Sequence, residues 1–561
     1  MAISTIEAPL LSDTVDGAVD YKGRPVLRST FSSWRSASFI LGVEVAERFA
    51  YYGISCNLIT YLTGPLGQST VTAAENVNAW SGTALLLPLL GAFVADSFLG
   101  RYRTIIIASL IYILGLGLLT LSAMLPTGDT KISLGSSNQL QVTLIFVSLY
   151  LVAVGEGGHR PCVQAFGADQ FDGQDPEESK ARSSFFNWWF LGVCGGSAVT
   201  ILVLTYVQEN LSWGLGFGIP CIAMVAALGV FLLGTRTYRY TTKGDEKNPF
   251  LRIGRVFVTA VRNWRTTPSA IAFEEEAHRT LPHHSSQQFK FLNKALLFPD
   301  GSKEAGKVCT FSEVEEAKTV LRLVPIWVTS LGYAIAIAQI STFFTKQGST
   351  MDRTIFPGFE IPAASLQCLV DLSAILLIPI YDRIAVPIAR AFTRKPSGIT
   401  MLQRIGTGML ISAFSMVVAA LVEMKRLKTA KEYGLVDMPD VTVPMSVWWL
   451  VPQYVLWGAA DVFTAVGLQE FFYDQVPTDL RSLGLALYLN TIGIGSFLSS
   501  FLVSVIEEAT GRDGRDSWFA DNLNRAHLDY FYWLLAGINA VALAAFLCCA
   551  KSYIYNRPST I

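Results

Sequence analysis

The sequence predicts an all-α membrane protein in which twelve transmembrane helices form two six-helix halves. Its 561 residues are 51% hydrophobic and only 16% charged, whereas soluble domains carry about 25% charged residues. Twelve apolar stretches come close to the ~20 residues that a helix needs to cross a bilayer. A long polar segment separates the first six stretches from the last six. This arrangement is typical of transporters built from two related halves, with the binding site between them near the middle of the membrane.

The first half is predicted to occupy residues 36–235 and to contain six spans. They cover residues 39–61, 78–98, 104–125, 142–166, 185–207 and 213–233. Residues 236–317 are polar and charged, and are predicted to form a central loop. The second half, residues 318–550, is predicted to contain the other six spans. They cover residues 320–344, 362–380, 401–422, 447–472, 485–506 and 528–547.

Both tails, residues 1–35 and 551–561, and the central loop are predicted to lie in the cytosol. The first 35 residues are polar and include several acids, which does not fit a cleavable signal peptide. Most arginines and lysines of the loops fall on the predicted cytosolic side, as the positive-inside rule requires. Four cations near the end of the ninth span fall on the opposite side, and a ten-span alternative would place them differently: Lys425, Arg426, Lys428 and Lys431.

The composition argues against several classes of protein. A net charge of −1 gives no reason to expect a nucleic-acid partner. The eight cysteines lie mostly in apolar stretches without a CxxC pair, so neither a zinc site nor a disulfide framework is predicted. No nucleotide-binding loop, HExxH motif or Ser-His-Asp pattern indicates an enzyme or a bound cofactor. Acids at 274–276 with His283 and His284 could bind a metal, but a solvated loop is the favoured interpretation.

The first span contains three ionisable residues, Glu44, Glu47 and Arg48. Their spacing places them on nearly the same face of a helix. Ionisable groups at membrane depth cost a few kcal/mol or more each, so they usually face a water-filled path and serve a function there. The alternative is an internal ion pair that locks two helices together. We favour a functional cluster.

Three further spans contain ionisable residues. The fourth carries Glu156, His159 and Arg160, the eighth carries Asp371 and the tenth carries Asp461. Acids and bases on different helices can pair in one conformation and separate in another. A carboxylate keeps its charge beside an arginine and takes up a proton when the pair opens in a dry site. A set of charges across both halves therefore predicts proton coupling, although each pair alone could be structural.

Five motifs resemble the plant nitrate transporter/peptide transporter family, part of the proton-dependent oligopeptide transporter branch of the major facilitator superfamily. The resemblance extends over nearly the whole chain. The motifs are Glu44-x-x-Glu47-Arg48, Gly91-x-x-x-x-Asp96-x-x-x-Gly100-Arg101, Phe166-Gly-Ala-Asp-Gln-Phe-Asp172, Phe185-Phe-Asn187 and Phe344-Thr-Lys-Gln-Gly348. The resemblance implies the major facilitator fold and a central cavity lined by a basic residue of helix four and an acid of helix ten.

Carried over residue by residue, the resemblance assigns proton binding to Glu44, Glu47 and Arg48. Arg160 matches the basic residue of helix four, which is commonly lysine. Asp461 matches the acid of helix ten, which is commonly glutamate. Arginine stays charged when buried and binds carboxylates through two parallel hydrogen bonds, which a lysine cannot do.

Four other positions complete the predicted substrate and regulatory sites. Ile337 aligns with the nitrate-binding histidine of a well-studied relative, and this departure removes the residue that would argue directly for nitrate. Glu156 stands where a small or hydroxyl residue is common and adds an acid, and Tyr52 is also assigned to the substrate site. Thr104 matches a regulatory phosphothreonine, with Arg101 three residues before it, although capping of helix three is the favoured role.

The expected function is proton-coupled symport of a small anionic or zwitterionic solute by alternating access, with nitrate as the leading candidate. A di- or tripeptide, hormone or glycoside substrate, a ligand sensor with little transport and a scaffold of static ion pairs are the alternatives. The expected partners are the substrate, protons, the bilayer and a kinase that acts on Thr104, while the oligomeric state stays open. Glu7-Ala-Pro-Leu10-Leu11 resembles an acidic dileucine sorting signal and points to the vacuolar membrane. The plasma membrane is the alternative location.

Overall fold

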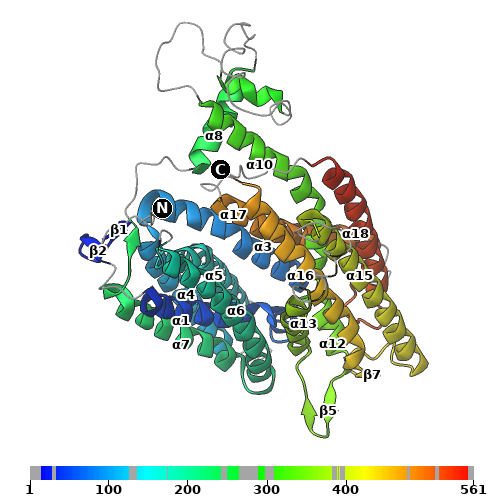
Figure 1. Ribbon diagram of the computed structural model, residues 1–561. Coiled ribbons are helices and arrows are strands. Elements are labelled where there is room, and N and C mark those ends of the chain that lie inside the picture. The colour runs from blue at the N-terminus through cyan, green and yellow to red at the C-terminus, as the bar shows by residue number, and fades with distance from the viewer. Residues whose placement is uncertain are drawn as a thin grey trace, which may run out of the picture.

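The computed structural model forms two helical bundles side by side (Figure 1). The first half of the chain builds one bundle, drawn in blue to teal, and the second half builds the other, drawn in green to red. The structure describes residues 14–27, 33–125, 136–172, 175–241, 249–264, 289–296, 309–381, 399–476, 481–511 and 517–553, with the single positions 384, 388 and 391.

Each of the six predicted spans of the first half coincides with a helix or a helix pair. In chain order these are α1 (Ser33–Ser55) with α2 (Leu58–Thr63), α3 (Thr70–Val94) with the π-helical turn η1 (Ala95–Leu99), α4 (Arg101–Met124), α5 (Ser136–Ala168), α6 (Pro176–Asn210) and α7 (Trp213–Leu233). The short 3₁₀ turn η2 (Gly234–Arg236) follows.

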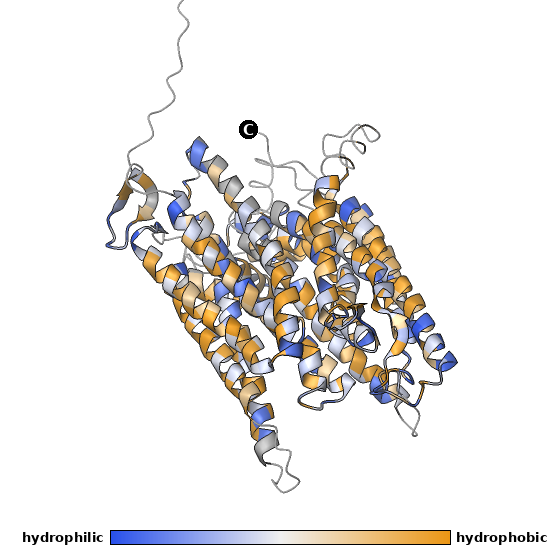
Figure 2. Cartoon of the chain, turned by 90° about the horizontal axis from the view of Figure 1, so that it is seen from below, coloured by the Kyte–Doolittle hydropathy of each residue, from blue (hydrophilic) through white to orange (hydrophobic). Residues whose placement is uncertain are grey.

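The predicted spans of the second half also coincide with helices, and these helices are interrupted at more places. In chain order its helices are α10 (Phe311–Thr329), α11 (Leu331–Ile337) and α12 (Phe343–Ser349), then η4 (Ala363–Gln367) with α13 (Cys368–Ile380), α15 (Met401–Glu432), η6 (Val447–Leu450) with α16 (Val451–Asp474), α17 (Arg481–Thr510) and α18 (Leu528–Lys551). Eight helices of the described chain are long and apolar enough to cross a membrane, or nine if α10 and α11 form one bent span. Apolar residues dominate most of the long helices in Figure 2.

The seventh span is broken, whereas the sequence predicted one helix over residues 320–344. α10 ends at Thr329, and α11 continues at an angle of 48°. The hydroxyls of Thr329 and Ser330 donate to the carbonyls of Pro325 and Ile326 at 2.9 and 2.8 Å. Hydroxyl groups that bond back onto the preceding turn are a known cause of helix bending.

The ninth span is longer than predicted, and the four cations that fell on the unexpected side lie on its extension. α15 runs to Glu432, ten residues beyond the predicted end. Arg426 is fully buried there and contacts Glu423 at 2.6 Å. The Nζ of Lys425 lies 3.1 Å from the ring centre of Trp449, while Lys428 and Lys431 are exposed. At least one of these cations is therefore part of the packing of the helix extension.

Glycines in the second motif have two different roles. Gly100 turns the chain, with φ of +79°. Gly91 instead lies inside α3, where an added Cβ would come 2.1 Å from the carbonyl oxygen of Gly157 on α5. Its missing side chain therefore lets two helix backbones touch. Arg101 of the same motif forms an ion pair with Asp169 of the third motif.

Two segments predicted to be only polar contain regular structure. β1 (Thr14–Val19) of the N-terminal tail pairs antiparallel with β2 (Pro25–Leu27) and β3 (Tyr240–Thr241). In the central loop, α8 (Pro249–Arg262) and the 3₁₀ helix η3 (Lys290–Leu296) are helical. The arginines of α8 hold it against α10, through Arg252–Glu316 at 2.9 Å and Arg255–Glu313 at 2.6 Å. The acids at 274–276 and the two histidines considered as metal ligands lie outside the described residues.

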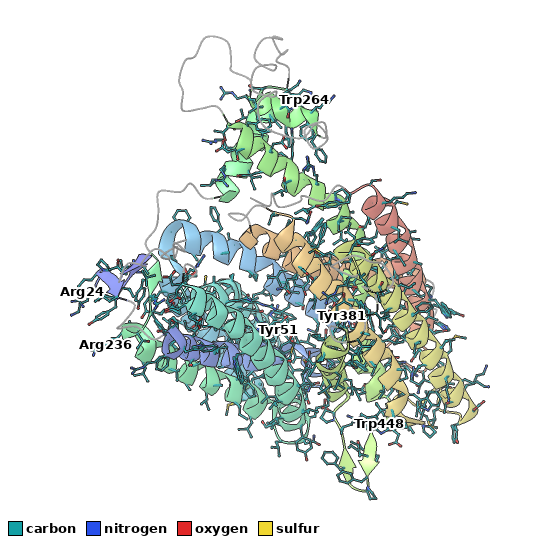
Figure 3. The ribbon with its side chains drawn as sticks, in the orientation of Figure 1. Arg24, Tyr51, Arg236, Trp264, Tyr381 and Trp448 are labelled. Carbon is teal, nitrogen blue, oxygen red and sulfur yellow. The ribbon has the colours of Figure 1, made fainter. Side chains whose placement is uncertain are left out.

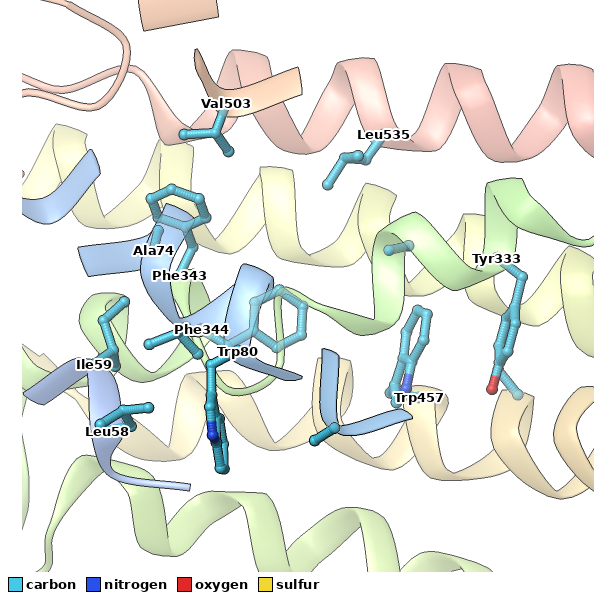
Figure 4. Close-up of a cluster of buried hydrophobic side chains, with 14 of the residues drawn as sticks. Leu58, Ile59, Ala74, Trp80, Tyr333, Phe343, Phe344, Trp457, Val503 and Leu535 are labelled. Atoms are coloured by element: carbon cyan, nitrogen blue, oxygen red, sulfur yellow. The ribbon is translucent and has the colours of Figure 1, made fainter. Parts of the chain in front are cut away.

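The two halves contact each other at the end opposite α8. A buried apolar cluster there joins α2 and α3 to α12 and α17, as Figure 4 shows with Leu58, Trp80 and Phe343 among its members. Polar links between the halves surround it: Lys346 to Thr63 (2.9 Å), Gln367 to the Cys56 carbonyl (2.9 Å), Thr205 to Ser365 (2.9 Å), Asn78 to Ser499 (3.3 Å) and Arg353 to Glu209 (3.3 Å).

Short strands lie at this end of the molecule, where the two halves are in contact. β5 (Thr354–Phe356) and β6 (Phe359–Glu360) form an antiparallel hairpin, and β4 (Met351–Asp352) pairs in parallel with β7 (Val443–Ser446). The ring of Phe359 stacks on Tyr206 of α6, so the hairpin of the second half is also attached to the first half.

Candidate functional site

Helix α1 carries the three ionisable residues of the first span into the interior of the first half. Glu44, Glu47 and Arg48 are at most 4% exposed. The Nε of Arg48 donates to Glu44 Oε1 at 2.8 Å and lies 3.3 Å from Glu47 Oε2. The three charged side chains are therefore close together, as predicted, and one guanidinium interacts with both carboxylates.

Helix α5 brings the second group of charges to the same place, because glycines let it approach its neighbours closely. An added Cβ at Gly157 would lie 2.5 Å from Leu87 on α3, and one at Gly155 would lie 2.7 Å from Tyr112 on α4. The same turns carry Glu156 and Arg160, and Arg160 Nη1 donates to Glu156 Oε1 at 3.2 Å. Both spacings, Glu44 to Arg48 and Glu156 to Arg160, are the i,i+4 pairs of a helix.

Together these residues form the N-half charge cluster, which we define as Glu44, Glu47, Arg48, Glu156, His159 and Arg160. Ligand atoms of Glu44, Glu47 and His159 all lie within 4.8 Å of one another. Among the described residues, both nitrogens of His159 and both carboxylate oxygens of Glu47 lack a hydrogen-bond partner. Buried polar atoms normally have partners, so these atoms make the cluster a candidate site for a proton or another ligand.

The charges in this cluster do not balance. Three carboxylates face two arginines, so the cluster has a net charge of −1 when the three carboxylates are ionised and His159 is neutral. A buried net charge is unfavourable in a membrane interior. One bound proton would neutralise it. Two carboxylates and a histidine could also hold a divalent metal, but the guanidinium of Arg48 contacts both Glu44 and Glu47 and opposes a dication there.

The second half contributes two acids. Asp461 of α16 accepts a hydrogen bond from the Tyr333 hydroxyl at 2.7 Å, and the Tyr333 ring stacks on Trp457 (Figure 4). Asp371 of α13 accepts a hydrogen bond from Ser197 of α6 at 2.7 Å. Asp371 therefore links the two halves.

Tyrosines lie between the two sets of charges. Tyr488 of α17 is within electrostatic range of both Asp461 and Arg160. Tyr52 is within range of Asp371, Arg48 and Arg160. Tyr51 lies on the inner side of the first half (Figure 3) and stacks on Trp80. The sequence missed Tyr333, Tyr488 and Ser197, because tyrosines and serines in apolar helices carry no distinctive pattern.

The two remaining predicted positions are Ile337 and Thr104. Ile337 ends α11 and is half-buried against the main apolar core. Its side chain is a hydrocarbon and offers no polar group to a ligand. Thr104 is 5% exposed, and its hydroxyl donates to the Gly100 carbonyl at 3.0 Å. The N-cap of α4 is Gly100. The capping role favoured for Thr104 is therefore wrong, because this residue lies one turn inside the helix.

Comparisons with known proteins agree with this architecture. Residues 102–519 match the family model described as POT family. From Arabidopsis thaliana, Protein NRT1/PTR FAMILY 5.10 is 63% identical to this chain over 562 residues, which is 100% of this chain and 99% of that protein. Protein NRT1/PTR FAMILY 5.13 is 58% identical and covers 100% of both chains.

Among solved structures, an auto-inhibited POT family peptide transporter is 21% identical and superposes with a TM-score of 0.70, over 94% of this chain and 99% of its own. The POT family transporter PepTSo gives 0.67 over 92% and 98%, also at 21% identity. These likenesses confirm the two-bundle fold. The chain belongs to the POT family, and it is a multi-pass membrane transporter and not an enzyme.

Proposed function

We propose that this transporter is a proton-coupled symporter of a small anionic or zwitterionic solute, with nitrate as the leading candidate. The observation that carries the proposal is the N-half charge cluster, in which three buried carboxylates face two arginines. Such a cluster binds a proton readily and holds it away from bulk water. Glu44 and Glu47 bind the coupling proton, and Arg48 sets their affinity for it.

The substrate binds between the two halves. The side chain of Arg160 is 23% exposed, whereas that of Arg48 is 5% exposed, so Arg160 is the cation that a solute reaches. Asp461 of α16 and Arg160 are both within electrostatic range of Tyr488. An anion needs only the basic side of this arrangement together with a bound proton.

A zwitterionic substrate, such as a short peptide, is the second candidate. Its carboxylate would bind Arg160, and its amino group would bind Asp461 or Asp371, which are acids of the opposite half. Hormones and glycosides remain open alternatives within the same family resemblance. A sensor with little transport would bind its ligand at the same place and signal through the central loop.

Alternating access supplies the transport step. A ligand or proton drives the cycle only through different affinities for the two conformations. The links between the halves at the end opposite α8, such as Lys346 to Thr63 and Gln367 to Cys56, must break when that end opens. The proton and the solute together offset the loss of these links.

The first test is uptake of labelled nitrate into oocytes at acidic external pH. Leu10 and Leu11 are replaced by alanine in one variant, because we propose that the dileucine signal directs the protein to the vacuolar membrane in preference to the plasma membrane. Surface expression is confirmed before uptake is compared with that of water-injected oocytes. Proton-dependent uptake supports the proposal. Surface protein without uptake rejects nitrate and directs the search to peptides, hormones and glycosides.

The proton site is tested with Glu47→Gln. This change keeps the size of the side chain and removes its ability to lose a proton. We expect proton-driven accumulation to be lost while exchange of solute across the membrane continues. Full accumulation by this variant at acidic pH would remove Glu47 from the mechanism.

We also propose that a kinase regulates transport at Thr104. The hydroxyl of Thr104 is buried and bonded to the Gly100 carbonyl, so the first turn of α4 must open before a kinase can reach it. Phosphate detected at Thr104 after treatment with a basophilic kinase would support this proposal, and an unmodified Thr104 in a protein modified elsewhere would reject it.

A further inference from the structure

The carboxylate of Glu156 is paired with Arg160, the arginine that the proposed function assigns to the substrate. Its Oε1 accepts a hydrogen bond from Arg160 Nη1 at 3.2 Å, and its side chain is completely buried. Its Oε2 has no hydrogen-bond partner among the described residues. The pair lies within one helix, so it forms without help from the other half of the protein.

The groups around Glu156 explain why it keeps this partner. From α1, Arg48 and Glu47 lie within electrostatic range of Glu156, and from α4 the hydroxyl of Tyr112 does. Arg48 is already shared between Glu44 and Glu47. Tyr51 of α1 is also near. Arg160 is therefore the one cation of the N-half charge cluster left for Glu156.

An anion cannot simply be added to this arrangement. A solute anion that bound Arg160 would place a fourth negative charge beside two arginines in a buried site. Like charges at short distance in a low-dielectric interior repel strongly. If Glu156 takes up a proton, its charge disappears and Arg160 is free to bind an anion without changing the charge of the cluster.

We propose that Glu156 is a proton-linked internal competitor for Arg160, so that an anion binds Arg160 only after Glu156 has taken up a proton. This inference deepens the proposed function and depends on it, because it makes the protonation of Glu156 a condition for anion binding in addition to the protons of Glu44 and Glu47. The proton comes from the aqueous side that the site faces and adds to a carboxylate oxygen. It leaves to water on the other side when the anion departs.

The test compares purified wild-type protein with three variants, all reconstituted in lipid nanodiscs. Glu156→Gln cannot release a proton and cannot pair with Arg160 as an anion. Arg160→Gln removes the anion site. Glu470→Gln is the matched control, because Glu470 also pairs with an arginine, Arg404 at 3.1 Å, although this arginine is on a neighbouring helix and the pair lies outside the cluster.

The first measurement is nitrate affinity by calorimetry across a range of pH. In the wild type and in Glu470→Gln, we expect the dissociation constant for nitrate to fall as pH falls. One linked proton changes affinity by up to about tenfold per pH unit. In Glu156→Gln we expect the affinity at neutral pH to reach the wild-type value at acidic pH, with the pH dependence reduced by one proton. A Glu156→Gln variant with the wild-type pH dependence would overturn the proposal.

The second measurement needs no substrate and separates this inference from the choice of nitrate. Infrared difference spectra of the empty protein, recorded during a pH titration, show the C=O stretching band of any carboxyl group that takes up a proton. We expect part of this band to be absent in Glu156→Gln and present in Glu470→Gln. We also expect its titration midpoint to change in Arg160→Gln.

The two measurements fail in different ways. If the wild type does not bind nitrate but the band depends on Glu156 and Arg160, the choice of nitrate is wrong and the role of Glu156 is supported. If Glu156→Gln leaves the band unchanged, the role of Glu156 is overturned whatever nitrate does. If Glu156→Gln does not fold, Glu156→Ser replaces it with the same expectations, since a small hydroxyl residue fits within the volume of the glutamate.

Discussion

The contact between α3 and α5 determines where the charges of α5 lie, and Gly91→Ala tests it. The Cβ of an alanine at this position would lie 2.1 Å from the carbonyl oxygen of Gly157, 2.7 Å from its carbonyl carbon and 2.8 Å from the Cα of Gly158. All three are backbone atoms, so no side chain can turn aside to make room. A carbon and an oxygen normally stay more than about 3 Å apart, so the helices must separate by roughly 1 Å.

We expect two consequences of this separation. Overpacking of this kind costs about 1–3 kcal/mol, which lowers the midpoint of thermal unfolding by a few degrees. The outward shift of α5 also moves Glu156 and Arg160 away from α1, so transport should fall by more than the loss of folded protein explains. A displacement near 1 Å at a reacting group can lower a rate by about 100-fold.

The matched control is Gly117→Ala. Gly117 is also inside a transmembrane helix, α4, but an added Cβ would meet no atom within 4 Å. Alanine is the better helix former by about 1 kcal/mol, so this variant should be as stable as the wild type or more so. Both variants are compared by thermal unfolding in detergent and by uptake per folded molecule. Equal unfolding midpoints for Gly91→Ala and Gly117→Ala would refute the packing argument.

Two further predictions concern ion pairs and the link between the halves. Arg426→Met leaves Glu423 buried and unpaired, so it should cost about 3–5 kcal/mol, whereas Lys428→Met removes an exposed cation and should cost less than about 1 kcal/mol. Thermal unfolding measures the stability of both variants. Equal losses of stability would contradict the finding that Arg426 is buried and Lys428 is exposed. Ser197→Ala removes the hydrogen bond to Asp371, so deuterium exchange of α13, which carries Asp371, should rise. The double variant Asp371→Asn with Ser197→Ala should show little more deuterium exchange than Ser197→Ala alone. Full additivity of the two changes would show that the two residues act separately.

The sequence predicted most of the helices because the membrane imposes a simple rule. A span must be apolar and about 20 residues long, and all twelve predicted spans coincide with helices. The same rule did not reveal the break at Ser330 or the extension of α15 to Glu432. A bend depends on hydroxyls that bond back onto the preceding turn, and helix length beyond the membrane depends on contacts such as that of Arg426 with Asn524.

Pairs of residues within one helix were determined by the sequence itself. Glu44 with Arg48 and Glu156 with Arg160 are four residues apart, so any α-helix brings each pair together. Their presence in apolar stretches is enough to identify them as functional candidates, because charges are costly at membrane depth. The imbalance of three carboxylates against two arginines also follows from the sequence, once both pairs are known to share one site.

That shared site, and its relation to the second half, was decided only by the tertiary structure. Gly91 and Gly157 let α3 and α5 touch. Tyr333 reaches Asp461 from 128 positions away and Ser197 reaches Asp371 from 174 positions away. These contacts join residues far apart in the sequence, so no pattern within one segment predicts them. The packing of whole helices determines which of these residues meet. The residues of the site were therefore determined locally, and their arrangement by the contacts between helices.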